Sequence, residues 1–298
     1  MTMEKISVDL NVTSSEEILE QMYQDYLSCP KAVKYLKGLG LTDEQIRLNI
    51  AKVYDFVSDI KYCSKCPGVD KCQKENPLFC TRITYKGGYV DREIQPCKKF
   101  LEKIELENQF LVRDFEDDIL TKKISDLDRN DERAKIVGKY MNFLNKKVND
   151  WIYINGVQNS GRSYIASILV VDAAKKGQGP VIFANCTKRI SELLEYYYKD
   201  KERFKKEIAR YSNVPILVLD DFGNEIKNDI IRDAIIFPII SNRASKRLFT
   251  IITSDFPIED IVSLYSTSKA GSIRANQIGK ILSGSCGKEF NLGDLPVY

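Results

Sequence analysis

The chain has 298 residues, of which 43% are hydrophobic, and its 45 basic and 42 acidic residues give a net charge of +3. This length and hydrophobic fraction predict one large or two ordinary domains with buried cores, and the balanced charge does not by itself indicate a nucleic-acid-binding protein. Histidine is absent, which excludes Ser-His-Asp and Cys-His catalysis and leaves metal binding to cysteine and carboxylate side chains.

The N-terminal part of the chain is expected to be helical. Apolar residues at helical spacing predict two amphipathic helices, one over about 15–26 and one over about 42–60. A cluster of five cysteines follows, at Cys63, Cys66, Cys72, Cys80 and Cys97. Because the other three cysteines are scattered singly, the cluster marks a separate module, and we expect a small, mainly helical domain over residues 1–104.

The cysteine cluster predicts a structural zinc site. Cys63 and Cys66 form a C-x-x-C motif, which can present two thiolates to one tetrahedral Zn²⁺ ion. Five cysteines compete for four positions, so spacing alone leaves the ligand set open. Disulfides are the main alternative, but cytosolic thiols stay reduced and an odd number leaves one unpaired. The scattered Cys29, Cys186 and Cys286 are expected to be small core residues.

The chain changes character after the cysteine cluster. Residues 105–133 are rich in charge and lack a sustained apolar period, which predicts a charged linker. Beyond it, apolar strands are expected at 151–154, 180–183, 215–219 and 248–252, separated by helical segments. This alternation predicts an α/β domain over residues 134–298, with a central parallel sheet flanked by helices.

The first of these strands leads into a near match to a phosphate-binding loop. Residues 156–163 fit G-x-x-x-x-G-K-[ST] except that Arg162 replaces the lysine. In such a loop, backbone N–H groups and the N-terminus of the next helix surround the phosphates of ATP, and Ser163 would bind Mg²⁺. The alternative is a plain glycine-bearing turn. The residues expected to bind nucleotide here are Gly156, Val157, Gln158, Asn159, Ser160, Gly161, Arg162, Ser163 and Tyr164.

Paired acids end the third apolar strand. We expect Asp220 to hold Mg²⁺ together with Ser163, and Asp221 to align or deprotonate the attacking water. Turn residues without a catalytic role are the alternative. Ser254 and Asp255 end the next strand, where a polar side chain could sense the terminal phosphate.

A basic segment near the C-terminus supplies two further candidates. Arg274 and Lys280 could act on nucleotide held by a neighbouring subunit, and solvated surface charges are the alternative. No segment approaches the roughly 20 apolar residues of a membrane span, and the N-terminus lacks the apolar core of a signal peptide. We therefore expect a cytoplasmic protein without a membrane partner.

Taken together, these motifs resemble the bacterial replicative helicase loaders of the DnaI/DnaC type, and most closely their DnaI branch. The resemblance covers most of the chain and rests on the segments 63–66, 95–97, 156–163, 219–223 and 254–256. It implies an AAA+ ATPase domain preceded by a zinc-binding domain that binds the hexameric replicative helicase. It also implies contact with single-stranded DNA and other primosome proteins, and self-oligomerisation on the helicase.

The resemblance also orders the candidates and exposes departures. Cys80 falls where related loaders carry a histidine ligand, so Cys63, Cys66, Cys80 and Cys97 become the favoured zinc ligands, with Cys72 in reserve. Three positions differ from the family: Arg162 replaces lysine, Asp255 replaces asparagine and Lys280 replaces an arginine that acts in trans. Because arginine and lysine are not equivalent beside phosphate, we expect ATP binding with slow hydrolysis.

Two other functions remain open at this point: a non-hydrolysing replication adaptor, and a related P-loop regulator of DNA transposition. Residues 196–206 combine aromatic rings with positive charge, as single-strand binding requires. The interpretation we favour for this segment is a helix with a solvated basic face.

Overall fold

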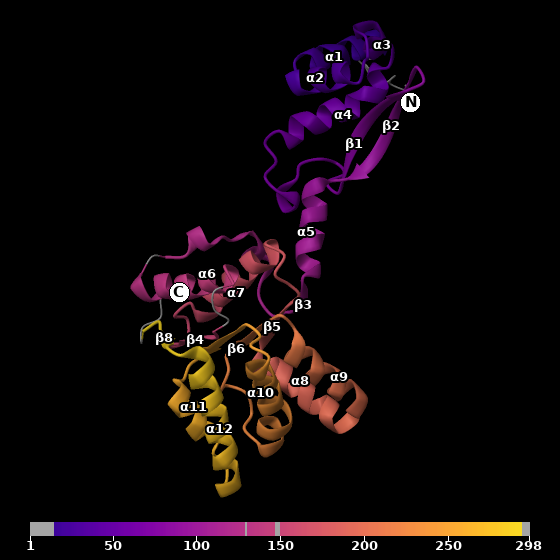
Figure 1. Cartoon of the computed structure of the whole chain (residues 1–298). Coiled ribbons are helices and arrows are strands. Elements are labelled where there is room, and N and C mark those ends of the chain that lie inside the picture. The colour runs from indigo at the N-terminus through magenta and orange to yellow at the C-terminus, as the bar shows by residue number, and fades with distance from the viewer. Residues whose placement is uncertain (1–14, 129, 147–149, 294–298) are drawn as a thin grey trace, which may run out of the picture. The chain divides into compact units, whose positions relative to one another are not determined.

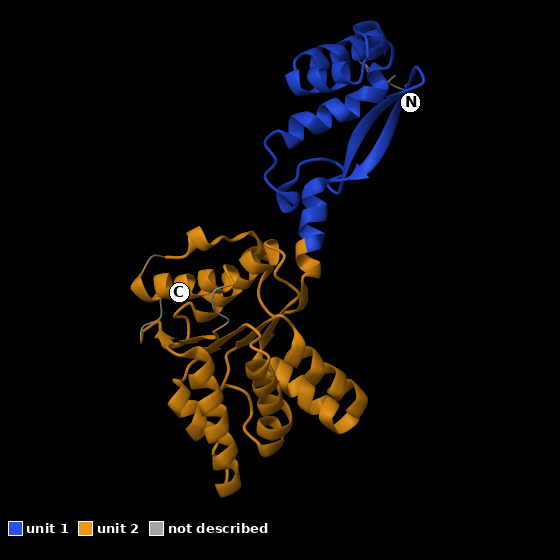
Figure 2. Cartoon of the chain, in the orientation of Figure 1, with its two compact units in different colours: residues 1–105 blue, residues 106–298 orange. Residues whose placement is uncertain are grey.

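The structure is a computed structural model that describes residues 15–128, 130–146 and 150–293. The chain divides into two compact units, unit 1 over residues 1–105 and unit 2 over residues 106–298 (Figure 2). Each unit has its own hydrophobic core.

Unit 1 begins with four helices, and the first confirms the helix predicted over 15–26. They are α1 (Ser15–Leu27), α2 (Pro30–Gly38), α3 (Asp43–Leu48) and α4 (Ile50–Cys63), as labelled in Figure 1. The single helix predicted over 42–60 is wrong, because it is interrupted at Asn49. There the side-chain amide of Asn49 donates to the carbonyl oxygen of Gln45, in α3, at 2.9 Å. Such side-chain bonds to the backbone compete with the hydrogen bonds of a continuous helix.

Unit 1 also contains a β-hairpin that the sequence analysis missed. Strands β1 (Phe79–Lys86) and β2 (Tyr89–Pro96) pair antiparallel, joined at Gly87 and Gly88. Both glycines have positive φ, 59° and 84°, which a two-residue hairpin turn of this kind requires. Ile83 and Val90 of the hairpin are buried in the core formed with the helices, so unit 1 is a mixed helix and hairpin unit.

Unit 2 is built on a parallel sheet, which confirms the predicted α/β class. Within the described residues the sheet has six strands in the order β3-β5-β6-β7-β4-β8, and all neighbouring pairs are parallel. The strands are β3 (Phe110–Arg113), β4 (Ile152–Asn155), β5 (Val181–Asn185), β6 (Ile216–Asp220), β7 (Thr250–Ser254) and β8 (Glu289–Asn291). The four predicted strands correspond to β4, β5, β6 and β7.

The segment expected to be a linker, 105–133, is partly built into this structure. Helix α5 (Lys98–Asn108) runs into it, and β3 forms an edge strand of the sheet. Ile119 and Leu120, from a 3₁₀ turn at Asp117–Thr121, are buried in the core of unit 2. The strand was missed because its four residues are too few to establish an apolar pattern among so many charges.

Helices cover both faces of the sheet in unit 2 (Figure 1). One face packs against α6 (Asp131–Leu144) and α7 (Arg162–Lys175). The opposite core includes residues of α8 (Cys186–Lys199), α9 (Lys201–Asn213), a π-helical turn (Ile231–Ile236), α10 (Phe237–Ser245), α11 (Ile258–Tyr265) and α12 (Lys269–Cys286). No helix in the described residues is long and apolar enough to cross a membrane.

The strand order places the candidate residues at one edge of the sheet. Because the strands are parallel, their carboxyl ends meet at a common edge, where α/β proteins bind ligands. Strands β6, β7 and β4 are adjacent. The loops that follow them carry the paired acids, Asp255 and the glycine-bearing loop, so three segments far apart in sequence converge.

Candidate nucleotide-binding site

The loop after β4 has the backbone geometry of a phosphate-binding loop. Gly161 is the N-cap of the 14-residue helix α7 and has a left-handed conformation, with φ of 90°. Gly156 has φ of 151°, and a Cβ there would lie 3.0 Å from Ser160 Oγ and 3.2 Å from the carbonyl oxygen of Gly293. Glycine is therefore required at both ends of the loop, and the N-terminus of α7 is free to face an anion.

Side chains within the loop also fit a bound phosphate. Ser160 is buried, and its Oγ has no hydrogen-bond partner within the described residues. Buried polar atoms are almost always satisfied, so this hydroxyl suits a polar ligand in the loop. Gln158 and Asn159 are exposed, Val157 is half-buried, and Tyr164 packs against the core beneath α7.

Arg162 lies inside the loop, with only 4% of its side chain exposed. Its Nη1 donates to the carbonyl oxygen of Gly156 at 2.6 Å. Its Nη2 forms an ion pair with Asp255 and lies 3.6 Å from Oδ1 of Asp221. The guanidinium therefore joins the loop to acids that follow the two neighbouring strands.

The two side chains expected to hold Mg²⁺ lie together. The hydroxyl of Ser163 lies near the carboxylate of Asp220, which accepts a hydrogen bond from Thr253 Oγ1 at 2.7 Å. Burial, reinforced by the neighbouring Asp221, raises the pKa of Asp220 to about 6. A divalent cation would relieve this cost by balancing the buried charge, so the oxygen ligands fit Mg²⁺.

The carboxylate of Asp221 is oriented by Asn185, a residue that the sequence analysis missed. The backbone N–H of Asp221 donates to Thr253 Oγ1 at 3.0 Å, and its Oδ2 accepts from Asn185 Nδ2 at 3.2 Å. Its φ is 54°, a conformation uncommon outside glycine. Burial raises the pKa of its carboxyl, whereas Arg162 lowers it. Asn185 ends β5, so the strand-end rule that identified Asp220 and Asp255 would also have found it.

Of the two residues at the end of β7, Asp255 is the one that reaches the loop. The hydroxyl of Ser254 donates to the carbonyl oxygen of Phe222 at 2.6 Å and accepts from the N–H of Phe256 at 3.1 Å. Ser254 is fully buried, and these bonds hold the two strand ends together. Asp255 contacts Arg162 through one oxygen and accepts from Asn224 Nδ2 at 2.7 Å through the other.

The C-terminal candidates lie on α12. The guanidinium of Arg274 stacks over the ring of Phe237 at 3.9 Å, donates to Gln277 and lies 3.5 Å from Asp233. Lys280 is exposed on the same helix. The contacts of Arg274 named here are with α10, the π-helical turn and its own helix and not with the loop, and a role of either residue in another subunit stays a prediction.

The clustered cysteines of unit 1 are neighbours but do not form a metal site. All eight cysteines lie within the described residues and all are free, so the disulfide alternative is not supported. Cys80 lies within electrostatic reach of Cys63 and Cys97, and Cys63 within reach of Cys66. Burial raises the pKa of Cys80 to about 11, so the neutral thiol is its stable form here.

The expected zinc site is therefore not assembled. Within the described residues, no group of three or more cysteine or carboxylate side chains is arranged to hold a metal. The ammonium of Lys74 lies 3.5 Å from Cys80 Sγ and 2.8 Å from Asp59, so the positive charge beside the thiol comes from a lysine.

Comparisons with known proteins agree with the fold and the loop. Residues 114–271, slightly more than half of the chain, match the family described as IstB-like ATP binding protein. The replicative helicase loader DnaI of Bacillus subtilis (strain 168) is 20% identical over 266 residues, which cover 85% of this chain and 84% of that protein.

Solved structures show the same fold as unit 2. A crystal structure of DnaI matches with a TM-score of 0.54 at 20% identity, covering 65% of this chain and 100% of that one. A putative primosome component from Streptococcus pyogenes serotype M3 matches with a TM-score of 0.51 at 18% identity, covering 65% of this chain and 98% of that one.

Proposed function

The chain belongs to the IstB-like ATP binding protein family, and from this premise we propose that it is a replicative helicase loader. One observation carries the proposal: the similarity to a protein named a helicase loader extends over 85% of the chain, beyond the part that the family match covers. The proposed nucleotide-binding unit is preceded by a smaller unit that has a separate hydrophobic core. This arrangement suits a protein in which nucleotide binding controls the interaction with a partner. The partner is the hexameric replicative helicase.

In the proposed nucleotide site, each element has one task. The N–H groups of the loop and the N-terminus of α7 hold the phosphates of ATP, and Ser163 with Asp220 holds Mg²⁺. Bound Mg²⁺ supplies positive charge to the phosphates. Asp221, oriented by Asn185, is placed to align a water molecule at the same edge of the sheet.

We propose that hydrolysis at this site is slow and that nucleotide acts mainly as an assembly switch. Arginine is a planar fork where lysine is a compact charge, and here the fork is already bonded to Gly156 and paired with Asp255. A phosphate-release assay with Mg-ATP and purified protein tests this. Turnover near one per second, within the ordinary range of enzymes, would contradict it.

The proposed helicase contact lies on unit 1. A groove of about 510 Å³ runs between α4 and the hairpin, and the side chains around it include Tyr62, Phe79 and Ile94. Ile94 is 66% exposed, and Tyr62 and Phe79 beside the same groove are 55% and 39% exposed, so the groove carries a group of exposed apolar side chains of the kind that partner-binding surfaces use. An Ile94→Ala variant should therefore co-purify less with the replicative helicase of the same organism.

The matched control for that experiment is Tyr89→Ala. Tyr89 is 80% exposed on the same hairpin but does not line the groove. Equal losses in both variants would argue against the groove. Failure of the wild-type chain to bind the helicase would favour the alternative of a DNA-transposition regulator.

Zinc stays a proposal for unit 1, with Cys63, Cys66, Cys80 and Cys97 as ligands, and binding would have to draw together thiols that are not arranged as a ligand group in this structure. The support is that Cys80 lies within electrostatic reach of Cys63 and Cys97, and Cys63 within reach of Cys66. Metal analysis of protein purified without chelator should find one zinc per chain. Cys80→Ser should lose it and Cys72→Ser should retain it, whereas equal retention in both variants would remove Cys80 from the ligand set.

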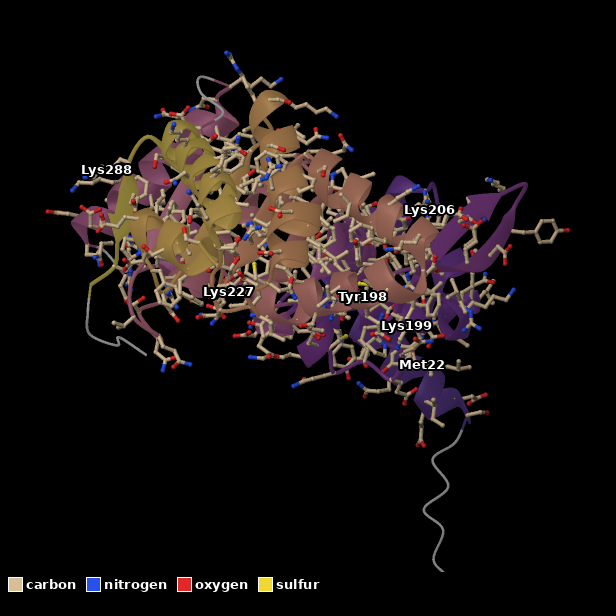
Figure 3. The ribbon with its side chains drawn as sticks, turned by 90° about the horizontal axis from the view of Figure 1, so that it is seen from below. Met22, Tyr198, Lys199, Lys206, Lys227 and Lys288 are labelled. Atoms are coloured by element: carbon tan, nitrogen blue, oxygen red, sulfur yellow. The ribbon has the colours of Figure 1, made fainter. Side chains whose placement is uncertain are left out.

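Single-stranded DNA is a proposed partner of unit 2. The side-chain contacts of α8 and α9 argue against these two helices as the surface that binds it. Lys199 and Lys206, labelled in Figure 3, lie on α8 and α9. Each pairs with a glutamate one helical turn earlier, at 2.7 and 2.8 Å. The rings of Tyr196 and Tyr197 lie under cations of α9. The segment 196–206 is two helices, with Asp200 capping the second, rather than the single helix we expected.

A Lys205→Ala/Lys206→Ala variant should accordingly keep most of its affinity for a labelled oligothymidine. A large loss in fluorescence anisotropy would assign DNA binding to this surface.

A further inference from the structure

The ion pair between Arg162 and Asp255 joins two residues that the resemblance to helicase loaders marks as departures. It links the first residue of α7 to the residue that follows β7, across two adjacent strands. The guanidinium has a neutral anchor in the Gly156 carbonyl at 2.6 Å, which holds it in the loop. Its Nη2 faces the carboxylates of Asp221 and Asp255.

The carboxylate of Asp255 is fixed from the other side. Oδ2 accepts from Asn224 Nδ2 at 2.7 Å, so the carboxylate cannot turn away freely. Oδ1 is buried and makes no hydrogen bond within the described residues, so its interaction there is the charge of Arg162. If a phosphate took Nη2 from it, a buried oxygen would lose its counter-charge beside a second anion.

The position of this pair matters for some phosphates more than others. In a phosphate-binding loop the backbone N–H groups hold the inner phosphates, and the basic residue at the position of Arg162 reaches toward the terminal ones. The inner phosphates therefore meet the amides of 156–161. The terminal phosphate of ATP would instead meet a guanidinium that already has an anionic partner.

We propose that Asp255 is a specificity-determining residue: its carboxylate occupies Arg162 in place of a terminal phosphate, so the site binds Mg-ADP at least as tightly as Mg-ATP. This rests on the proposed nucleotide binding at the loop, and it adds to that proposal the preference for a nucleoside diphosphate. The discrimination is electrostatic, because the carboxylate both competes for the cation and repels the phosphate.

Calorimetric titration of the full-length protein with Mg-ADP and Mg-ATP tests the proposal. Asp255→Asn keeps the size of the side chain and removes its charge, and it should raise the affinity for Mg-ATP about tenfold more than that for Mg-ADP. Asp255→Glu keeps the charge and should retain the wild-type preference. The affinity ratio is informative even if either variant is less stable, since both ligands are compared on one protein.

Asp229→Asn is the matched control. Asp229 pairs with Arg232, a guanidinium as buried as that of Arg162, at 2.8 Å and at a site away from the loop. This variant should leave the ratio unchanged. If both nucleotides bind and Asp255→Asn also leaves the ratio unchanged, the role of Asp255 is overturned while nucleotide binding stands. If neither nucleotide binds wild-type protein or any variant, both proposals fall.

Discussion

Two buried arginines of unit 2 have opposite surroundings. Arg243, on α10, is fully buried and donates to neutral oxygens: the hydroxyl of Thr250 and the carbonyls of Tyr211, Val214 and Phe249. Arg162, at the edge of the sheet, is almost as buried but faces the carboxylates of Asp221 and Asp255.

The difference in partners indicates different roles for the two guanidinium groups. Arg243 is structural, whereas Arg162 can interact with a bound anion. The carbonyls around Arg243 belong to the backbone of two segments, the end of α9 and the residue before β7, so they cannot move away independently of the fold. The carboxylates around Arg162 are charged side chains at the carboxyl edge of the sheet, so they compete with any incoming anion for the guanidinium. Burial alone therefore says little about function, whereas the mobility and charge of the partners say more.

The comparison is tested most severely at Arg243. Arg243→Met should lower the free energy of unfolding by about 3 kcal/mol or more, because it leaves buried carbonyl oxygens without donors. Burial lowers the pKa of Arg243 to about 9, so the guanidinium is charged at neutral pH and donates fully. Urea denaturation at neutral pH gives the value.

Arg247→Met is the control for that variant, since Arg247 is exposed two residues after the end of α10. A change within about 0.5 kcal/mol is expected there. Equal effects at the two positions would mean that the carbonyl cage around Arg243 contributes nothing specific.

The backbone of the loop provides the next largest effect. Gly156→Ala should lower the free energy of unfolding by about 1–3 kcal/mol, because φ of 151° is strained for any other residue and the new Cβ meets Ser160 and Gly293. It should also abolish nucleotide binding in calorimetry. Gly138→Ala, in the open interior of α6 with no atom near its added Cβ, should instead be neutral or slightly stabilising.

Arg162→Met sharpens the comparison because its effect depends on ligand. Without nucleotide it should lower the free energy of unfolding by about 1–2 kcal/mol, less than Arg243→Met, since the freed carboxylates are partly exposed and can recruit water or protons. With saturating Mg-ADP the deficit should grow, because the carboxylates of Asp221 and Asp255, left without Arg162, repel the phosphates and weaken binding to the variant. Thermal denaturation with and without ligand measures both, and a deficit that does not respond to ligand would make Arg162 merely structural.

The sequence located the strands and the loop because both depend on local pattern. The apolar runs that became β4, β5, β6 and β7 are buried on both faces, so they lack polar interruptions. The short edge strand β3 and the hairpin of unit 1 carry mixed patterns, and they were missed. The break at Asn49 was missed because one side chain, rather than a change in apolar spacing, ends the helix.

The partners of the site residues could not be predicted in the same way. Spacing placed Asp220, Ser254 and Asp255 at strand ends, but which of them reaches the loop depends on rotamers and on neighbouring strands. Ser254 turns inward to Phe222, and Asp255 turns outward to Arg162. The pairing of Arg162 with Asp255 depends on tertiary structure. The sequence alone shows two separate departures, with no sign that they contact each other.

The smallest effect is expected where charge pairs are exposed. Lys206 and Glu202 lie 2.8 Å apart on α9, yet both side chains are more than two-thirds exposed, at 73% and 79%. Water screens such a pair and ordering two long side chains costs entropy, so Lys206→Ala should change the free energy of unfolding by less than about 0.5 kcal/mol. Urea denaturation at low and at 0.5 M salt checks this. A loss comparable to that of Arg162→Met would show that ion-pair distance, rather than burial and partner mobility, determines what these contacts contribute.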